Sequence, residues 1–116
     1  MTDDRLMRSM LFDFYGELLT EKQREYYDLH YNEDLSLAEI AEQSGISRQG
    51  VWDIIRRAEA AMTEIEQKTG LIRRFNERSA VLTELESRLA ELEAVTDGRA
   101  GELAGEIREK LRELRI

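Results

Sequence analysis

The residues best suited to contact another molecule lie in the segment Ser47–Arg57, SRQGVWDIIRR. Serine commonly begins a helix, because its hydroxyl accepts a hydrogen bond from a free backbone N–H group. The first turn of such a helix also carries the positive end of the helix dipole, which favours phosphate. Arginine and glutamine can bond phosphates or base edges. The candidate nucleic-acid contacts are therefore Ser47, Arg48, Gln49, Trp52, Asp53, Arg56 and Arg57. An ordinary helical hairpin with a capped turn is the alternative.

A second candidate is a basic patch that follows this segment. Its members are Lys68, Arg73, Arg74 and Arg78, with Phe75 nearby. Such a patch can contact the phosphates of RNA or DNA, or an acidic protein. The alternative is a solvated helix surface, because Glu64, Glu66 and Glu77 balance its charge.

The sequence offers little else that could carry chemistry. It contains no cysteine and a single histidine, His30, which stands among tyrosines. A metal site needs more ligands than this, so we expect His30 to be a partly buried structural residue. No glycine-rich phosphate loop is present. We therefore predict no catalytic residues and no cofactor.

The candidate contacts require a helix-turn-helix, which the pattern places at residues 36–58. Ser36 and Glu39 form a capping-box pattern at the start of the first helix. Gly45 can take the positive φ that a sharp helix end requires, and Ile46 should anchor the turn. Ser47 then begins a second helix that extends to Gly70. Its expected buried side consists of Val51, Ile54, Ile55 and Ala58. Trp52 falls on the other side. It is either an exposed contact residue or, in the favoured interpretation, it packs beneath the C-terminal helices.

Two further helices should precede this module. The first is expected over residues 4–19, capped by Asp3 or Asp4. Its apolar positions recur at three- and four-residue spacing, at Met7, Met10, Leu11, Phe14, Leu18 and Leu19. The second begins at Thr20, where TEKQ is another capping-box pattern, and ends within residues 32–34.

The remainder of the chain predicts a helical arm. Leucines at 82, 85, 89 and 92 form a short heptad seam, and a second stripe follows at Leu103, Ile107, Leu111 and Leu114. A polar break at residues 96–98 separates them. The arm is either two antiparallel helices or a seam that recruits a second chain. We predict an all-α protein with a helical domain over residues 1–75 and an arm for self-association over residues 76–116.

Charge argues against a simple DNA-binding protein. The net charge is −8, although residues 35–57 and 58–78 are each neutral. Residues 1–34, by contrast, hold nine acidic and four basic residues. No apolar run approaches the length of about 18 residues that a membrane span needs. We expect a cytoplasmic protein without membrane insertion.

The segment LFDFYGELLTEKQREYYDLHYNEDLSLAEIAEQSGISRQGVWDIIRR resembles the YlxM-type helix-turn-helix proteins of Gram-positive bacteria. The similarity covers residues 11–75, and residues 37–57 also resemble region 4 of sigma-70-type factors. The resemblance implies an all-helical, non-enzymatic protein whose genes lie beside those of the signal recognition particle pathway. The family motif's recognition helix corresponds to the candidate contacts named above. Trp52, Ile54 and Gly50 depart from the usual tyrosine, asparagine and alanine.

Two functions follow as hypotheses. The first is a regulatory protein of the signal recognition particle pathway that inserts the start of the helix at Ser47 into a nucleic-acid groove. The second is a protein–protein accessory factor of the pathway's GTPase or receptor that has lost DNA binding. In both, the arm is expected to form a homodimer.

Overall fold

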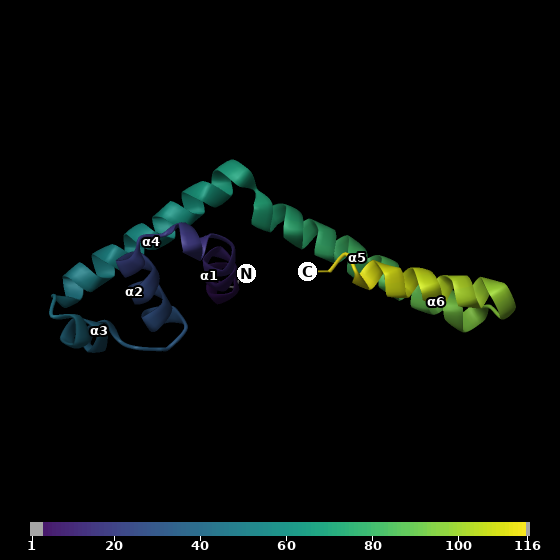
Figure 1. Ribbon diagram of the computed structural model, residues 1–116, viewed down its shortest axis with the longest axis horizontal. Helices are drawn as coiled ribbons and strands as arrows, with labels where there is room; N and C mark the ends of the chain where they lie inside the picture. Colours follow the sequence, from purple (N-terminus) through teal and green to yellow (C-terminus); the bar gives the residue numbers. More distant parts are fainter. Residues whose placement is uncertain (1–3, 116) are drawn as a thin grey trace. The chain divides into compact units, whose positions relative to one another are not determined.

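The computed structural model describes residues 4–115, and all regular elements in this range are helical (Figure 1). They are α1 (Asp4–Tyr15), a 3₁₀ turn (Gly16–Leu18), α2 (Glu21–Tyr31), α3 (Leu37–Ser44), α4 (Arg48–Thr69), α5 (Leu71–Val95) and α6 (Gly98–Arg112). The predicted all-α class is confirmed. The described residues form two compact units, one ending at Ile72 and the other beginning at Arg73.

Short polar motifs set the helix starts in the first unit. Thr20 Oγ1 accepts from the backbone N–H of Gln23 at 3.3 Å, and the Gln23 side chain accepts from the Thr20 N–H at 3.1 Å. Ser36 and Glu39 repeat the arrangement at 3.1 and 2.9 Å. Because two free N–H groups are satisfied at each site, the sequence alone determines both starts. Both predicted capping boxes are confirmed.

The first helix is shorter than expected. It ends at Tyr15 and passes into the 3₁₀ turn, while Asp3, one of the two expected caps, lies outside the described residues. A 3₁₀ turn has about three residues per turn, so positions beyond Tyr15 leave the α-helical face. Leu18 is therefore 69% exposed, and the prediction that it faces the core was wrong. Phe14, also predicted to face inward, is likewise exposed.

The core of the first unit forms where α1, α2 and α3 pack against α4 (Figure 1). Its α4 face consists of Val51, Ile55, Ala58 and Met62, all fully buried. Ile54 was expected there too but is half-buried at its edge. Tyr26 and Tyr27 of α2 are also almost fully buried. The core therefore fixes α4 along much of its length, including the start that carries the candidate contacts.

A polar cluster at the end of α4 joins three segments. The Tyr15 hydroxyl donates to Glu66 Oε1 at 2.5 Å and also lies 2.8 Å from Thr69 Oγ1. Glu66 Oε1 also accepts from the backbone N–H of Ile72 at 3.0 Å. Burial and the neighbouring Glu66 carboxylate raise the pKa of Tyr15. One carboxylate therefore holds α1 and the first turn of α5 to the end of α4.

The second unit is an antiparallel hairpin of α5 and α6. Arg108 pairs with Glu93 at 2.8 Å, and Arg115 pairs with Glu86 at 2.8 Å. Later residues of the C-terminal helix therefore contact earlier residues of α5, as in an antiparallel pair. The break lies where it was predicted, because α5 ends at Val95 and α6 begins at Gly98. Of the two alternatives for the arm, the structure has the hairpin.

The predicted leucine seam is divided between two sides of this hairpin. Leu82 is buried and Leu89 half-buried, whereas Leu85 and Leu92 are more than 40% exposed. On α6, Ala104 is buried, while most of the expected stripe is exposed, at Leu103, Ile107 and Leu114. The inner side of α6 instead holds the small Ala104, which is buried, and Leu111, the one member of the expected stripe that is half-buried.

Candidate nucleic-acid interface

The turn of the helix-turn-helix depends on one left-handed residue. Gly45 ends α3 with φ 71° and ψ 24°, and its N–H donates to the carbonyl oxygen of Ala41 at 2.9 Å. A residue with a Cβ is strained at such a φ, so glycine is the favoured type. Ile46, the expected apolar anchor of the turn, follows and is 38% exposed.

Ser47 begins α4 as predicted. Its backbone is extended, at φ −72° and ψ 158°, and its Oγ accepts from the Gly50 N–H at 3.0 Å. The backbone N–H groups of Arg48 and Gln49 come next, in the first turn of α4. Ser47, Arg48 and Gln49 are all exposed in the structure. The tip of α4 therefore presents backbone N–H groups, one guanidinium and one amide together, a combination that suits a phosphate or a base edge.

The exposed face continues for two turns along α4. Arg56 and Arg57 are exposed on the side away from the core, because a helix turns by about 100° per residue. Asp53 lies between them and the tip, and it pairs with Arg56 at 3.2 Å. Since both side chains are well exposed, this pair contributes little stability. It does offset part of the positive charge of the candidate surface.

Trp52 lies at the boundary of this face. It is half-buried and packs against the core of the first unit. The expectation that it stands fully on the exposed side was wrong, because α4 is covered over a wider arc than its most buried residues indicate. The favoured interpretation was that Trp52 packs beneath the C-terminal helices and is therefore hidden within the fold. The structure supports this in part, with the core of its own unit as the contact.

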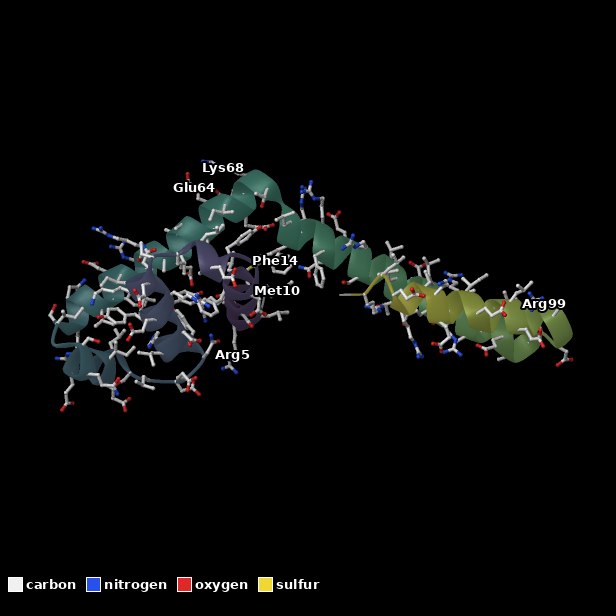
Figure 2. The ribbon with its side chains drawn as sticks, viewed as in Figure 1. Arg5, Met10, Phe14, Glu64, Lys68 and Arg99 are labelled. Carbon is white, nitrogen blue, oxygen red and sulfur yellow. The ribbon has the colours of Figure 1, made fainter. Side chains whose placement is uncertain are left out.

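The second predicted patch is divided between the two units. Lys68 is at the end of α4 and pairs with Glu64 at 3.2 Å, and Figure 2 shows both side chains on the same side of this helix. Arg73, Arg74 and Arg78 are exposed on α5 in the second unit. The structure thus places three of the arginines on one helix, and Lys68 on another with an acidic partner.

His30 has the structural role expected of it. It is half-buried, its Nδ1 lies 2.8 Å from the carbonyl oxygen of Leu35, and its ring meets Tyr31 edge-on. Within residues 4–115, no group of three or more histidine, cysteine or acidic residues could hold a metal ion. None of the helices in this range is long and apolar enough to cross a membrane.

Sequence analysis missed the contacts that join α2 to its neighbours. The Tyr27 hydroxyl donates to Glu59 Oε1 on α4 at 3.1 Å, and the Tyr27 ring stacks on Phe12 of α1. Burial and the Glu59 carboxylate raise the pKa of Tyr27 well above its usual range. Arg8 of α1 lies 4.6 Å from the centroid of the Tyr31 ring. Such pairs join different helices, so periodicity within one helix does not reveal them.

Comparison with known families gives one consistent result. A sequence profile of the family UPF0122, described as "Putative helix-turn-helix protein, YlxM / p13 like", matches residues 2–99. That range contains the whole candidate interface and α5, and it ends at the start of α6. A helix-turn-helix family points to nucleic-acid binding and to a non-enzymatic, regulatory type of protein.

Relatives in bacilli are similar along most of their length. A UPF0122 protein of Shouchella clausii is 50% identical over 95 residues, which is 82% of this chain and 87% of the relative. One from Halalkalibacterium halodurans is 51% identical over 85 residues, covering 73% and 78% of the two chains. One from Bacillus mycoides is 45% identical over 97 residues, covering 84% and 88%.

Proposed function

Because the chain belongs to the UPF0122 family of YlxM/p13-like helix-turn-helix proteins, we propose that it is a non-enzymatic regulatory protein that binds DNA or RNA through the start of α4. The observation that carries this proposal is the exposure of Ser47, Arg48 and Gln49 at a capped helix start. In this proposal Arg48 and Gln49 contact base edges, while Arg56 and Arg57 contact phosphates. Trp52 and Asp53 border the contact.

The charge of the chain sets the expected strength of binding. The net charge of −8 repels nucleic acid at long range, whereas residues 35–57 are neutral. Few phosphates can be neutralised by this surface, so affinity should be modest and should fall as salt rises. Binding is best sought at low ionic strength.

The decisive experiment is fluorescence anisotropy with labelled duplex DNA and structured RNA at about 50 mM salt. The Arg48→Ala/Gln49→Ala variant should bind at least about tenfold more weakly, since each lost contact to a base or phosphate costs about 1–3 kcal/mol. The matched control is Arg88→Ala/Gln67→Ala, which removes the same two residue types from exposed positions away from the α4 tip. Wild-type protein that binds neither nucleic acid would refute the proposal.

We further propose that the protein acts in the signal recognition particle pathway, in the cytoplasm. The support is the resemblance to a family whose genes lie beside those of that pathway. A crosslinking pull-down from the native cytosol, resolved into RNA, DNA and protein, tests this assignment. Recovery of signal recognition particle RNA or protein is expected, and recovery of unrelated nucleic acid alone would count against it.

In a second candidate function, the protein is an accessory factor that binds the GTPase of the signal recognition particle pathway or the receptor of that pathway. The Asp53–Arg56 pair favours it, because an acidic side chain within the proposed reading face opposes phosphate contact. The exposed Arg73, Arg74 and Arg78 of α5 would then dock on an acidic protein surface. Co-purification with the GTPase without nucleic-acid binding would select this function over the first.

We also propose that the protein is a homodimer formed through the second unit. At about 100° per residue, Leu85 and Leu92 of α5 and Ile107 of α6 fall on the same side of the antiparallel hairpin. The Arg108–Glu93 and Arg115–Glu86 pairs lie toward the other side. Exposed large apolar side chains gathered on one side are typical of a protein interface, and a second copy offers an identical face.

Sedimentation velocity at tens of micromolar tests the dimer. Wild-type protein should sediment as a dimer, and Leu85→Glu should sediment as a monomer because it places a charge in the interface. Ser87→Glu adds the same charge at an exposed position on the opposite side of α5 and should remain dimeric. A monomeric wild type would contradict the proposal.

A further inference from the structure

A polar cavity between α1 and the end of α2 has no role in the functions considered so far. Its volume is about 530 Å³, and it lies entirely within the first unit. Arg5, Arg8 and Ser9 of α1 line one side, and His30 and Tyr31 of α2 line the other. Figure 2 shows Arg5 projecting from the start of α1. Small-molecule sites commonly have volumes of about 300–1,000 Å³, so the cavity is large enough for one.

The charged residues that line this cavity are two arginines and one aspartate. Residues 1–34 carry nine acidic and only four basic residues, yet Arg5 and Arg8 both line it. Arg8 is half-buried, and its guanidinium carbon lies 4.6 Å from the centroid of the Tyr31 ring. An arginine that stacks on an aromatic ring keeps its N–H edges available for hydrogen bonds. Arg8 is therefore held where it can bind a phosphate oxygen.

The orientation of His30 is also fixed. Its Nδ1 lies 2.8 Å from the carbonyl oxygen of Leu35, and a carbonyl oxygen only accepts. Nδ1 must therefore carry a hydrogen, which leaves Nε2 as the ring atom for a ligand. Ser9 also lines the cavity, and a serine hydroxyl can donate or accept.

The remaining wall narrows the class of ligand. Asp34, in the loop after α2, also lines the cavity and has φ 60°. Its carboxylate repels a bare anion but accepts a hydrogen bond from a hydroxyl or amino group. Asn32 beside it is held by a 2.7 Å bond from its amide to Asp28 Oδ1. The lining thus combines an anion-binding side with an acceptor side.

We propose that this cavity binds a small phosphate ester that also carries hydroxyl or amino groups, of which a mononucleotide is the simplest example. Arg5 and Arg8 bind the phosphate, with Ser9 as a further donor. Asp34 accepts hydrogen bonds from the hydroxyl or amino groups. His30 Nε2 forms a hydrogen bond with the ligand between these groups and the phosphate. This site does not depend on nucleic-acid binding by α4.

The test is a titration of the full chain with adenosine 5′-monophosphate, followed by amide and histidine NMR signals. Saturable shifts are expected around Arg8 and His30. Inorganic phosphate should bind more weakly at the same residues, because it lacks groups for Asp34. Adenosine alone should produce no saturable shift there, because it lacks the phosphate.

Variants locate the site. Arg5→Gln changes an exposed side chain, so the fold should persist, and it should weaken binding of the nucleotide at least about tenfold. Arg8→Gln should do the same, with circular dichroism as the check on folding. Arg24→Gln removes an exposed arginine of α2 outside this cavity and should leave binding unchanged.

Three results would overturn the proposal. One is the absence of shifts at nucleotide concentrations up to about 10 mM, because a dissociation constant above this value would be too weak for a specific site. Another is equal binding of adenosine. The third is an RNA oligonucleotide that shifts the same signals at lower concentration than the nucleotide, which would assign the cavity to a nucleic-acid surface. The Arg48→Ala/Gln49→Ala variant should still bind the nucleotide, so failure of either proposal can be recognised separately.

Discussion

The two units contain similar proportions of apolar residues but bury them to different extents. In the first, side chains from four helices meet, and Ile40, Val51, Ile55 and Met62 are fully buried. In the second, two helices meet along one line, and Leu82 and Ala104 are the buried residues among those described. Within the second unit, α5 and α6 have no third helix to cover their outer faces. The first unit has the core of an independent domain, whereas the second leaves most of its large apolar side chains exposed.

The largest expected difference between the units concerns core truncation. Ile55→Ala should lower the free energy of unfolding by about 2–5 kcal/mol, because a fully buried side chain leaves a cavity. Leu92→Ala, at a position that is 46% exposed, should cost clearly less in protein diluted until monomeric. Urea denaturation of both variants measures this. Equal costs would show that Leu92 is packed as tightly as Ile55 and would break the comparison.

A partly buried polar contact should have the next largest effect. Tyr15→Phe removes the hydroxyl that bonds Glu66 and Thr69, at a residue only 2% exposed. Bonds to charged groups contribute about 1.5–3 kcal/mol, so a loss of this order is expected in the same denaturation experiment. Tyr31→Phe, at a half-buried ring, is the control and should cost less. A neutral Tyr15→Phe would show that the cluster does not stabilise the first unit.

The corresponding polar contact of the second unit should contribute less. Glu93 pairs with Arg108 at 2.8 Å, but the two side chains remain 36% and 28% exposed. Solvent screens such a pair, so Glu93→Gln should cost about 1 kcal/mol or less. Thermal unfolding followed by circular dichroism checks this value. A loss as large as that of Tyr15→Phe would make the hairpin as tightly organised as the first unit.

The smallest effect concerns the pH dependence of the first unit. The hydrogen bond that the Ser36 backbone N–H donates to the Glu39 carboxylate lowers the pKa of Glu39 below its ordinary value of 4.5. A carboxylate with a lowered pKa stabilises the fold above its ordinary pKa, and this contribution disappears as pH falls through the folded pKa. Glu39→Gln should therefore flatten the loss of stability between pH 5 and the acid limit. Unchanged acid dependence would mean that this capping box contributes no pH-dependent stability.

The elements that sequence predicted well are those whose signals are local. The capping boxes at Thr20 and Ser36 and the left-handed turn at Gly45 each depend on residues within four positions, and all are present. The helix-turn-helix and its exposed tip follow from them. The family resemblance located the same segment independently.

The features that sequence could not predict depend on how far each helix is covered. Trp52 is half-buried because neighbouring helices cover a wider arc of α4 than its apolar stripe indicates. Leu85 and Leu92 repeat at the same spacing as Leu82 and Leu89, yet only the latter pair faces α6. Spacing identifies an apolar stripe, but the partner that covers it is set by packing between helices. The cavity beside Arg8 is likewise formed between two helices.

The position of Trp52 has a spectroscopic consequence. It is the single tryptophan, it lies on α4, and all four tyrosines belong to the first unit, whereas Phe75 is the aromatic residue of the second. Intrinsic fluorescence should therefore report only the first unit, while the amide signal in circular dichroism reports both. The unlabelled protein thus carries an optical probe at the border of its own proposed reading face, with no competing emission from the hairpin.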